Sequence, residues 1–141
     1  MSAGKPRAAG LAAVDPPQLG APRGYSHGIL VPAGRRLLFV AGQVGWGPGQ
    51  TLVAGGLVEQ FAQALRNALA VVRAAGGEPA DVARLTLYVL DREDYARQSA
   101  ELGRRYRELM GRHYPAMALV EVRGLMEPGA LIEIEATAAV P

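Results

Sequence analysis

Carboxylates near the C-terminus are the side chains best placed for acid–base chemistry in this 141-residue chain. Glu133 and Glu135 alternate with Ile132 and Ile134, so a strand here has one apolar face and one face bearing carboxylates. A carboxylate in that position can activate a water molecule as a general base. It can also be an ordinary exposed strand residue beside a second carboxylate, and the spacing alone favours this second interpretation.

Thiol, metal and nucleotide chemistry receive little support. The chain contains no cysteine, which excludes disulfides, thiolate metal ligands and thiol catalysis. Its two histidines, His27 and His113, are far apart in the sequence, so we expect no dedicated zinc site. The glycine-rich residues 45–49 resemble a phosphate-binding loop only superficially, because no Lys-Ser/Thr pair follows them. We therefore expect neither a metal nor a cofactor.

Composition and charge restrict the class of protein. Half of the residues are hydrophobic, a fifth are charged, and the net charge is +2, which is typical of one globular domain and excludes wholesale disorder. No apolar run approaches the ~20 residues of a membrane span, and the N-terminus has no convincing signal peptide. Arginines between Arg97 and Arg112 are offset by Glu101 and Glu108. We expect a cytoplasmic protein that binds neither membranes nor nucleic acid.

The elements that must position these residues follow from hydrophobic periodicity. Residues 1–24 are rich in Ala, Gly and Pro and predict a flexible N-terminal extension, followed by a single domain over 25–141. Two short apolar runs, residues 30–31 and 37–41, predict a hairpin. A stripe of Phe61, Leu65, Leu69 and Val72 predicts a helix that ends at Gly76-Gly77.

The second half of the chain predicts a strand, a helix and two more strands. Residues 83–89 alternate as a half-buried strand. Asp91 then caps a helix that must end before Pro115, and residues 116–122 and 131–137 form the last strands. The order is that of an α+β fold, with one sheet and both helices on a single face. Its uncovered face would need a partner, for which symmetric self-association is the usual solution.

Several segments, taken together and in this order, resemble the Rid family, also called the YjgF or reactive-intermediate deaminase family. They cover the chain from Tyr25 to its end and comprise Gly24-Tyr25-Ser26, residues 38–43, 60–67 with 74–76, 81–82 with 89–91, Pro115-Ala116, 120–122 and 132–136. The resemblance implies a chorismate-mutase-like ββαβαββ subunit in a homotrimer with clefts between subunits. It also implies hydrolysis of enamines and imines to 2-oxo acids and ammonia, without a metal or cofactor.

The resemblance also implies a set of site residues. A glutamate that positions or activates water matches Glu133, and a tyrosine that lines the cleft matches Tyr25, which could instead merely pack an edge. An arginine that clamps the substrate carboxylate in the family is replaced here by Met117. Leu119 stands where many members have cysteine, and Ser99 where asparagine is typical. The implied ligand cleft therefore comprises Tyr25, Ala41, Gly42, Ser99, Met117 and Leu119.

The exchange of arginine for Met117 predicts a changed ligand. A charged hydrogen-bonded pair contributes roughly 1.5–3 kcal/mol, so its loss weakens the binding of a carboxylate and predicts a less anionic ligand. Met117 and Leu119 could also be core between subunits. The expected function is a trimer that binds a small molecule without standard 2-iminoacid deaminase activity. The alternatives are hydrolysis of a non-carboxylate imine by Glu133 and, less favoured, a ribonuclease. A different cation beside Met117 would overturn this reasoning.

Overall fold

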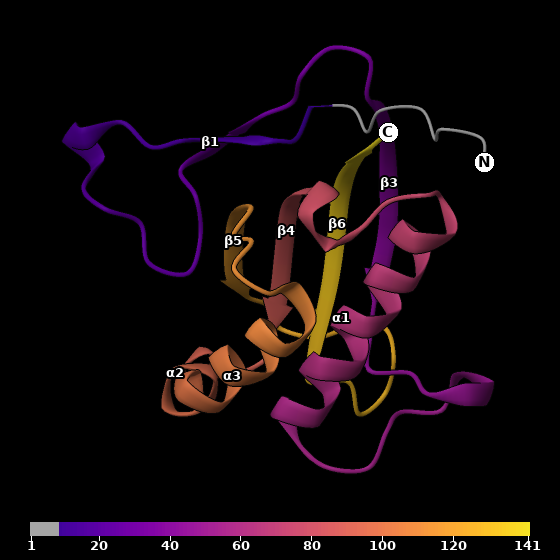
Figure 1. Ribbon diagram of the computed structural model, residues 1–141. Helices are drawn as coiled ribbons and strands as arrows, with labels where there is room; N and C mark the ends of the chain where they lie inside the picture. The colour runs from indigo at the N-terminus through magenta and orange to yellow at the C-terminus, as the bar shows by residue number, and fades with distance from the viewer. Residues whose placement is uncertain (1–8) are drawn as a thin grey trace.

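The computed structural model describes residues 9–141 and shows a four-stranded sheet with helices across one face (Figure 1). The strands are β3 (Arg36–Gln43), β4 (Val82–Val89), β5 (Ala116–Glu121) and β6 (Ile132–Val140), in the order β3-β6-β4-β5. β6 is antiparallel to both of its neighbours, whereas β4 and β5 are parallel. The helices are α1 (Leu57–Ala74), α2 (Arg92–Arg97) and α3 (Ser99–Met110). Within residues 9–141, none of them has the length and apolarity to cross a membrane.

The core lies between the sheet and α1, as the sequence periodicity predicted. Phe61, Leu65, Leu69 and Val72 are all nearly inaccessible to solvent, because steps of three and four residues keep them on one face of the helix. In β6 every second residue from Ile132 to Ala138 is buried, and the residues between them are half-buried. The predicted helix end is confirmed, since Gly76 has a left-handed φ of 87° just beyond α1.

The predicted hairpin between residues 30–31 and 37–41 is wrong. β2 (Gly28–Leu30) pairs instead with β1 (Ala12–Val14) in a separate two-stranded sheet. The physical reason is that Ser26 forms a bridge to Ala116 beside β5, while β3 lies at the opposite edge of the main sheet. The chain must cross from one edge to the other between residues 26 and 36, so the two apolar runs cannot pair.

Two further expectations differ from the structure. The predicted flexible extension over residues 1–24 contains β1, which is hydrogen-bonded to β2, and a short 3₁₀ turn at Pro17–Leu19; residues 1–8 lie outside the described residues. The single helix predicted after Asp91 is divided at Gln98 into α2 and α3. The predicted cap is confirmed, because the backbone N–H of Asp94 donates to the Asp91 carboxylate over 2.9 Å.

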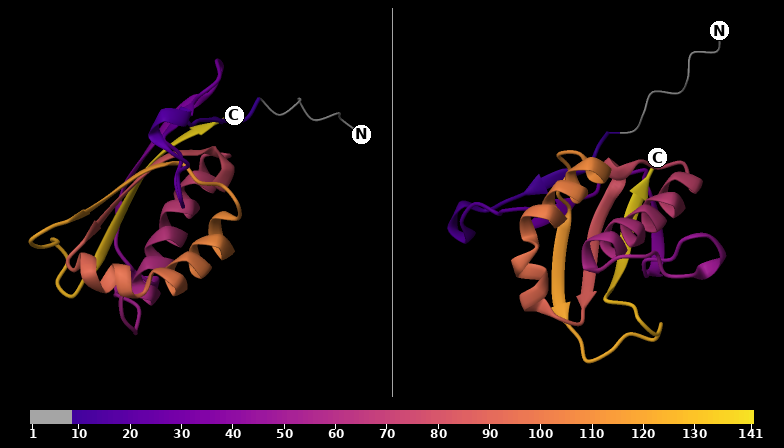
Figure 2. Two further views of the ribbon diagram at one scale, coloured as in Figure 1. Left: turned by 90° about the vertical axis from the view of Figure 1, so that its left-hand side faces the viewer. Right: turned by 90° about the horizontal axis from the view of Figure 1, so that it is seen from below.

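The face of the sheet opposite the helices is open, as Figure 2 shows. Phe39 and Leu37 of β3 are 76% and 61% exposed there, although large apolar side chains normally avoid water. The polar residues of this face include Tyr88 and Glu135, whose hydroxyl and carboxylate are hydrogen-bonded over 2.6 Å. The expectation of an uncovered sheet face is therefore confirmed.

Candidate functional site

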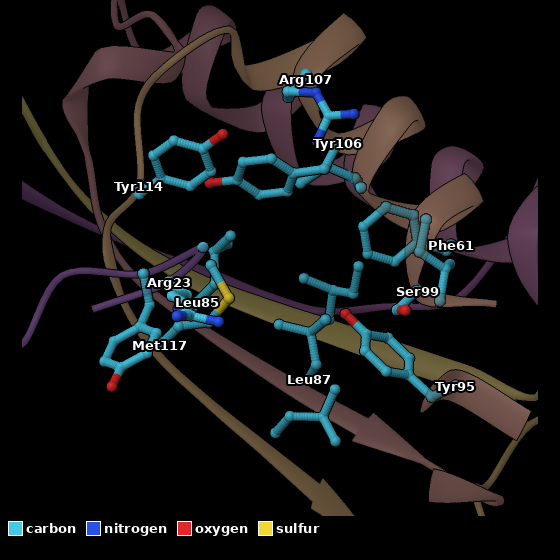
Figure 3. Close-up of a pocket in the computed structure, with 17 residues that line it drawn as sticks. Arg23, Phe61, Leu85, Leu87, Tyr95, Ser99, Tyr106, Arg107, Tyr114 and Met117 are labelled. Carbon is cyan, nitrogen blue, oxygen red and sulfur yellow. The ribbon is translucent and has the colours of Figure 1, made fainter. Parts of the chain in front are cut away.

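A cavity of about 530 Å³ lies between the helices and the β4–β5 end of the sheet (Figure 3). Its floor is apolar and comes mainly from the strands, its wall is aromatic, and two arginines line it. The lining residues are Arg23, Gly24, Tyr25, Phe61, Leu65, Leu85, Leu87, Tyr95, Ser99, Leu102, Gly103, Tyr106, Arg107, Tyr114, Met117, Leu119 and Ile134. Four of the predicted cleft residues are therefore brought together here: Tyr25, Ser99, Met117 and Leu119.

The register of the parallel strands explains the cavity floor. Met117 lies opposite Leu85 and Leu119 lies opposite Leu87. Leu85 and Leu87 are buried on the helix side of β4, and residues paired across a ladder share a face. Met117 and Leu119 therefore project to the same side, toward the helices. β5 is an edge strand, which leaves the cavity accessible beside it.

The N-terminal segment is fastened to this edge by Ser26. Its N–H donates to the carbonyl of Pro115 over 3.0 Å, and its hydroxyl donates to the carbonyl of Tyr114 over 2.5 Å. Ser26 is buried, and its bridge partner Ala116 precedes Met117 directly. Gly24 adopts a left-handed φ of 75° two residues before it. This attachment places Arg23 and Tyr25 at the mouth of the cavity.

Three tyrosines make the wall, and burial raises the pKa of two of them. The rings of Tyr106 and Tyr114 are stacked with centroids 5.4 Å apart, and the Tyr106 hydroxyl donates to the carbonyl of His113 over 2.6 Å. Burial raises the pKa of Tyr95 and, more strongly, the pKa of Tyr106. Both phenols therefore stay protonated at physiological pH and can only donate a proton to a hydrogen bond or accept one at the oxygen.

The cavity is lined by charged residues, although the sequence predicted only an apolar floor. Arg23 and Arg107 line it, and no Asp or Glu of residues 9–141 does. Figure 3 draws the Arg23 guanidinium at the Met117 end of the cavity. The cavity that Met117 lines is therefore also lined by guanidinium groups from other segments of the chain. The preference for a less anionic ligand, which rests on the missing arginine, stays a prediction.

The other three predicted residues lie on the opposite face of the sheet. Glu133 is half-buried between the inward-facing Ile132 and Ile134, and it rests against Gly42. A Cβ on Gly42 would lie only 2.8 Å from the Glu133 carboxyl carbon. Ala41 precedes Gly42, and the register shifts across both residues, so that β3 bulges beside the carboxylates of β6. Bulges of this kind are frequent next to active sites.

The electrostatics of this second group are set by neighbouring carboxylates. Tyr88 lies directly opposite Glu133 in the ladder and donates its hydroxyl proton to Glu135. That hydrogen bond and, to a lesser degree, the charges of Glu135 and Glu133 raise the pKa of Tyr88. Because Glu135 is occupied by Tyr88, whereas Glu133 accepts no side-chain hydrogen bond within residues 9–141, the two glutamates are not equivalent. The Glu133 carboxylate therefore has acceptor positions that no side chain of residues 9–141 occupies.

Sequence reasoning missed part of the cavity. The sequence patterns gave Tyr95 and Tyr106, in the helix predicted after Asp91, no role in a site, and Arg23 lies in the segment predicted to be a flexible extension. The available signal was the segment Gly24-Tyr25-Ser26, which Arg23 directly precedes. Within residues 9–141, no group of three or more histidine, aspartate or glutamate side chains is placed to hold a metal ion.

Comparison with known proteins identifies the family of this chain. The model of the family described as Endoribonuclease L-PSP matches residues 17–140. The human 2-iminobutanoate/2-iminopropanoate deaminase is 33% identical over 115 residues, which is 81% of this chain and 78% of that protein.

Solved structures agree in fold. A protein of unknown function of the conserved Rid family from Yersinia pestis has a TM-score of 0.83 and 36% identity, covering 94% of this chain and all of that one. The YjgF gene product of Escherichia coli has a TM-score of 0.64 and 30% identity, covering 90% and 95%. The chain has the α+β fold of these structures and belongs to the Rid family, of enamine and imine deaminase lineage.

Proposed function

We propose that the protein is a cytoplasmic homotrimer that binds a small molecule in clefts between neighbouring copies. We further propose that it hydrolyses an imine or enamine there, with Glu133 activating the attacking water. The observation that carries the proposal is the division of the site residues between two faces of one sheet. Tyr25, Ser99, Met117 and Leu119 line the helix-side cavity, whereas Glu133 and Gly42 meet on the open face.

A single chain does not bring its cavity and Glu133 together, whereas an assembly of several copies can. A ligand in the cavity cannot reach Glu133 of its own chain, because the backbone of the sheet lies between them. Two different surface patches that meet form a heterologous contact, and such contacts generate closed rings when the rotation closes. The exposed Leu37 and Phe39 support an open face that is covered in the assembly. A trimer in which one copy's cavity faces the next copy's Glu133 satisfies both requirements.

The proposed reaction in the cleft is the hydrolysis of an imine through a carbinolamine. The Glu133 carboxylate takes one proton from water while the water oxygen bonds to the imine carbon, and the C=N electron pair moves to nitrogen. Glu133 returns this proton to the nitrogen, which gives the carbinolamine. Glu133 then takes the hydroxyl proton and transfers it to the nitrogen as the C–N bond breaks, so that ammonia leaves and the hydroxyl oxygen becomes the carbonyl oxygen. An enamine enters the same sequence after it has taken a proton on carbon. General base catalysis of this kind contributes roughly 10²–10⁴-fold.

A nuclease function has less support from the charge distribution. The arginines Arg97, Arg104 and Arg105 form ion pairs with carboxylates of α1, α2 and α3. Paired guanidiniums are less available to phosphates than an open basic stripe would be.

The test compares two glutamates on the same face of β6. Imines are generated freshly from a panel of amino acids by an amino acid oxidase, and their decay is followed by trapping with semicarbazide. We expect Glu133→Gln to lower kcat by about 100-fold or more. Glu135→Gln should retain activity, because its carboxylate is bonded to Tyr88 on the same face. Native mass spectrometry of the wild type should show a trimer.

Each outcome has a definite consequence. A Glu133→Gln variant that runs at the wild-type rate contradicts the catalytic role of Glu133. Ligand binding without turnover of any imine would replace hydrolysis by a binding function, while a monomer would remove the shared cleft altogether.

A further inference from the structure

The charge of the helix-side cavity is one-sided. Arg23 and Arg107 line it, and the remaining lining residues are apolar, aromatic or neutral polar. Within residues 9–141, neither guanidinium forms an ion pair or a hydrogen bond with another residue. Both are at least partly open to solvent and carry a permanent charge. A cavity with two such cations and no carboxylate among its described lining residues favours an anion.

Arg23 is held at the cavity by the fold. Ser26 fastens the segment to the start of β5 through the carbonyls of Tyr114 and Pro115. Upstream, the His27 ring and the carbonyl of Gly20 are 3.0 Å apart, and the His27 N–H donates to Asp15 over 2.8 Å. The loop between Gly20 and His27 is therefore closed on itself, with Arg23 near its middle. The guanidinium is carried at the Met117 end of the cavity (Figure 3).

We infer that Arg23 binds the carboxylate of an anionic ligand in this cavity, replacing from the N-terminal segment the cation that position 117 lacks. A guanidinium presents a planar fork of donors that matches a carboxylate in a bidentate pair. Ser99 and Tyr95 line the same cavity and add neutral hydroxyl donors. The inference rests on the proposed function and deepens it, because it makes the substrate class a carboxylate.

The rest of the cavity indicates the body of that ligand. A volume of about 530 Å³ lies within the ~300–1,000 Å³ typical of small-molecule sites, and it exceeds what a carboxylate of a few carbons needs. Phe61, Leu87 and Leu102 contribute apolar surface, and the tyrosines contribute ring edges and faces. The ligand class is therefore a carboxylate that carries a large apolar or aromatic side chain.

The expected effect is moderate, because Arg23 is exposed. Hydrogen bonds to charged groups are stronger than those between neutral groups, but exposure to water weakens them. We therefore expect the Arg23 contact to change affinity by about tenfold, which corresponds to about 1.4 kcal/mol.

The test uses a matched pair of probes, 3-phenylpropanoate and its neutral amide 3-phenylpropanamide. Isothermal titration calorimetry measures both Kd values with the wild-type protein, because neither probe contains a C=N bond that could be hydrolysed. We expect the carboxylate to bind about tenfold more tightly than the amide. Arg23→Gln should remove this preference and leave the amide's Kd unchanged. Arg73→Gln removes one guanidinium from the last turn of α1, outside the cavity, and should leave the preference intact.

A second variant controls for a purely structural effect of Arg23→Gln. Adding Met117→Arg to it returns a guanidinium to the cavity floor and should restore the preference for the carboxylate. The inference is overturned if the wild-type cavity binds both probes equally or neither at millimolar concentration. It is also overturned if Arg107→Gln, rather than Arg23→Gln, removes the preference. Glu133-dependent turnover of neutral imines with no effect of Arg23→Gln would refute this inference and leave the proposed function standing.

Discussion

Gly42→Ala tests the position of the Glu133 carboxylate without altering the carboxylate itself. The added Cβ would lie 2.8 Å from the carboxyl carbon of Glu133 and 2.9 Å from one of its oxygens. Ordinary contact between carbon atoms needs about 3.5–4.0 Å, so the carboxyl group must retreat by roughly 0.7 Å or more. A misplacement of about 1 Å in a catalytic group can lower a rate by about 100-fold, which corresponds to about 2.7 kcal/mol in the barrier.

The fold should tolerate this change. The φ of Gly42 lies outside the left-handed region, so alanine can adopt its backbone conformation, and the loss of unfolding free energy should be about 1 kcal/mol or less. Gly124→Ala is the matched control, because a Cβ at Gly124 would have no other atom within 4 Å and the φ there is also outside the left-handed region. We expect imine turnover to fall about 100-fold in Gly42→Ala and to stay unchanged in Gly124→Ala.

A double-mutant cycle makes the reasoning refutable. If Gly42→Ala acts by displacing Glu133, it has no further effect on kcat once Glu133→Gln is present, because interacting residues are not additive. The measurement is the kcat of both single variants and of the double variant with one substrate. Independent, multiplicative losses would show that Gly42 acts otherwise, for example by blocking the ligand. Wild-type turnover in Gly42→Ala would show that the carboxylate need not stand where it does.

Two further predictions concern stability. Arg35 and Asp81 form a buried ion pair of 2.6 Å, so Asp81→Asn should lower the free energy of unfolding, measured in urea, by about 3 kcal/mol. As a control, Glu101→Gln in the exposed pair with Arg104 should leave this free energy unchanged. Equal effects of the two substitutions would refute the role of burial. Burial raises the pKa of Tyr106 in the folded state, so its contribution is complete below pH ~10, the unfolded value, and is lost as the pH rises further. The unfolding free energy should therefore fall above that pH, less steeply in Tyr106→Phe, and an identical slope would contradict the assignment.

Local patterns allowed much of the fold to be predicted. The α1 stripe and the alternation in β6 both appear in the structure, because the 3.6- and 2-residue periods put successive apolar residues on one face. The Asp91 cap is likewise local, since its partner Asp94 is only three residues away. The hairpin failed because pairing depends on which sheet edge each run reaches, and that is decided by the distant contact between Ser26 and Ala116.

The site divides in the same way. The sequence by itself determined the residue types: a glutamate on an alternating strand, a methionine at position 117, and a chain without thiols. Only the tertiary structure decided that Met117 and Glu133 lie on opposite faces of the sheet and that Arg23 lines the cavity. The physical reason is that periodicity fixes a side chain's face within its own element, whereas the neighbours of that face come from segments far away in the chain. Arg23 lies in a segment of low hydrophobicity, where no periodic pattern predicts the direction of a side chain. Its position is set by the hydrogen bonds of Ser26, which attach that segment to the start of β5.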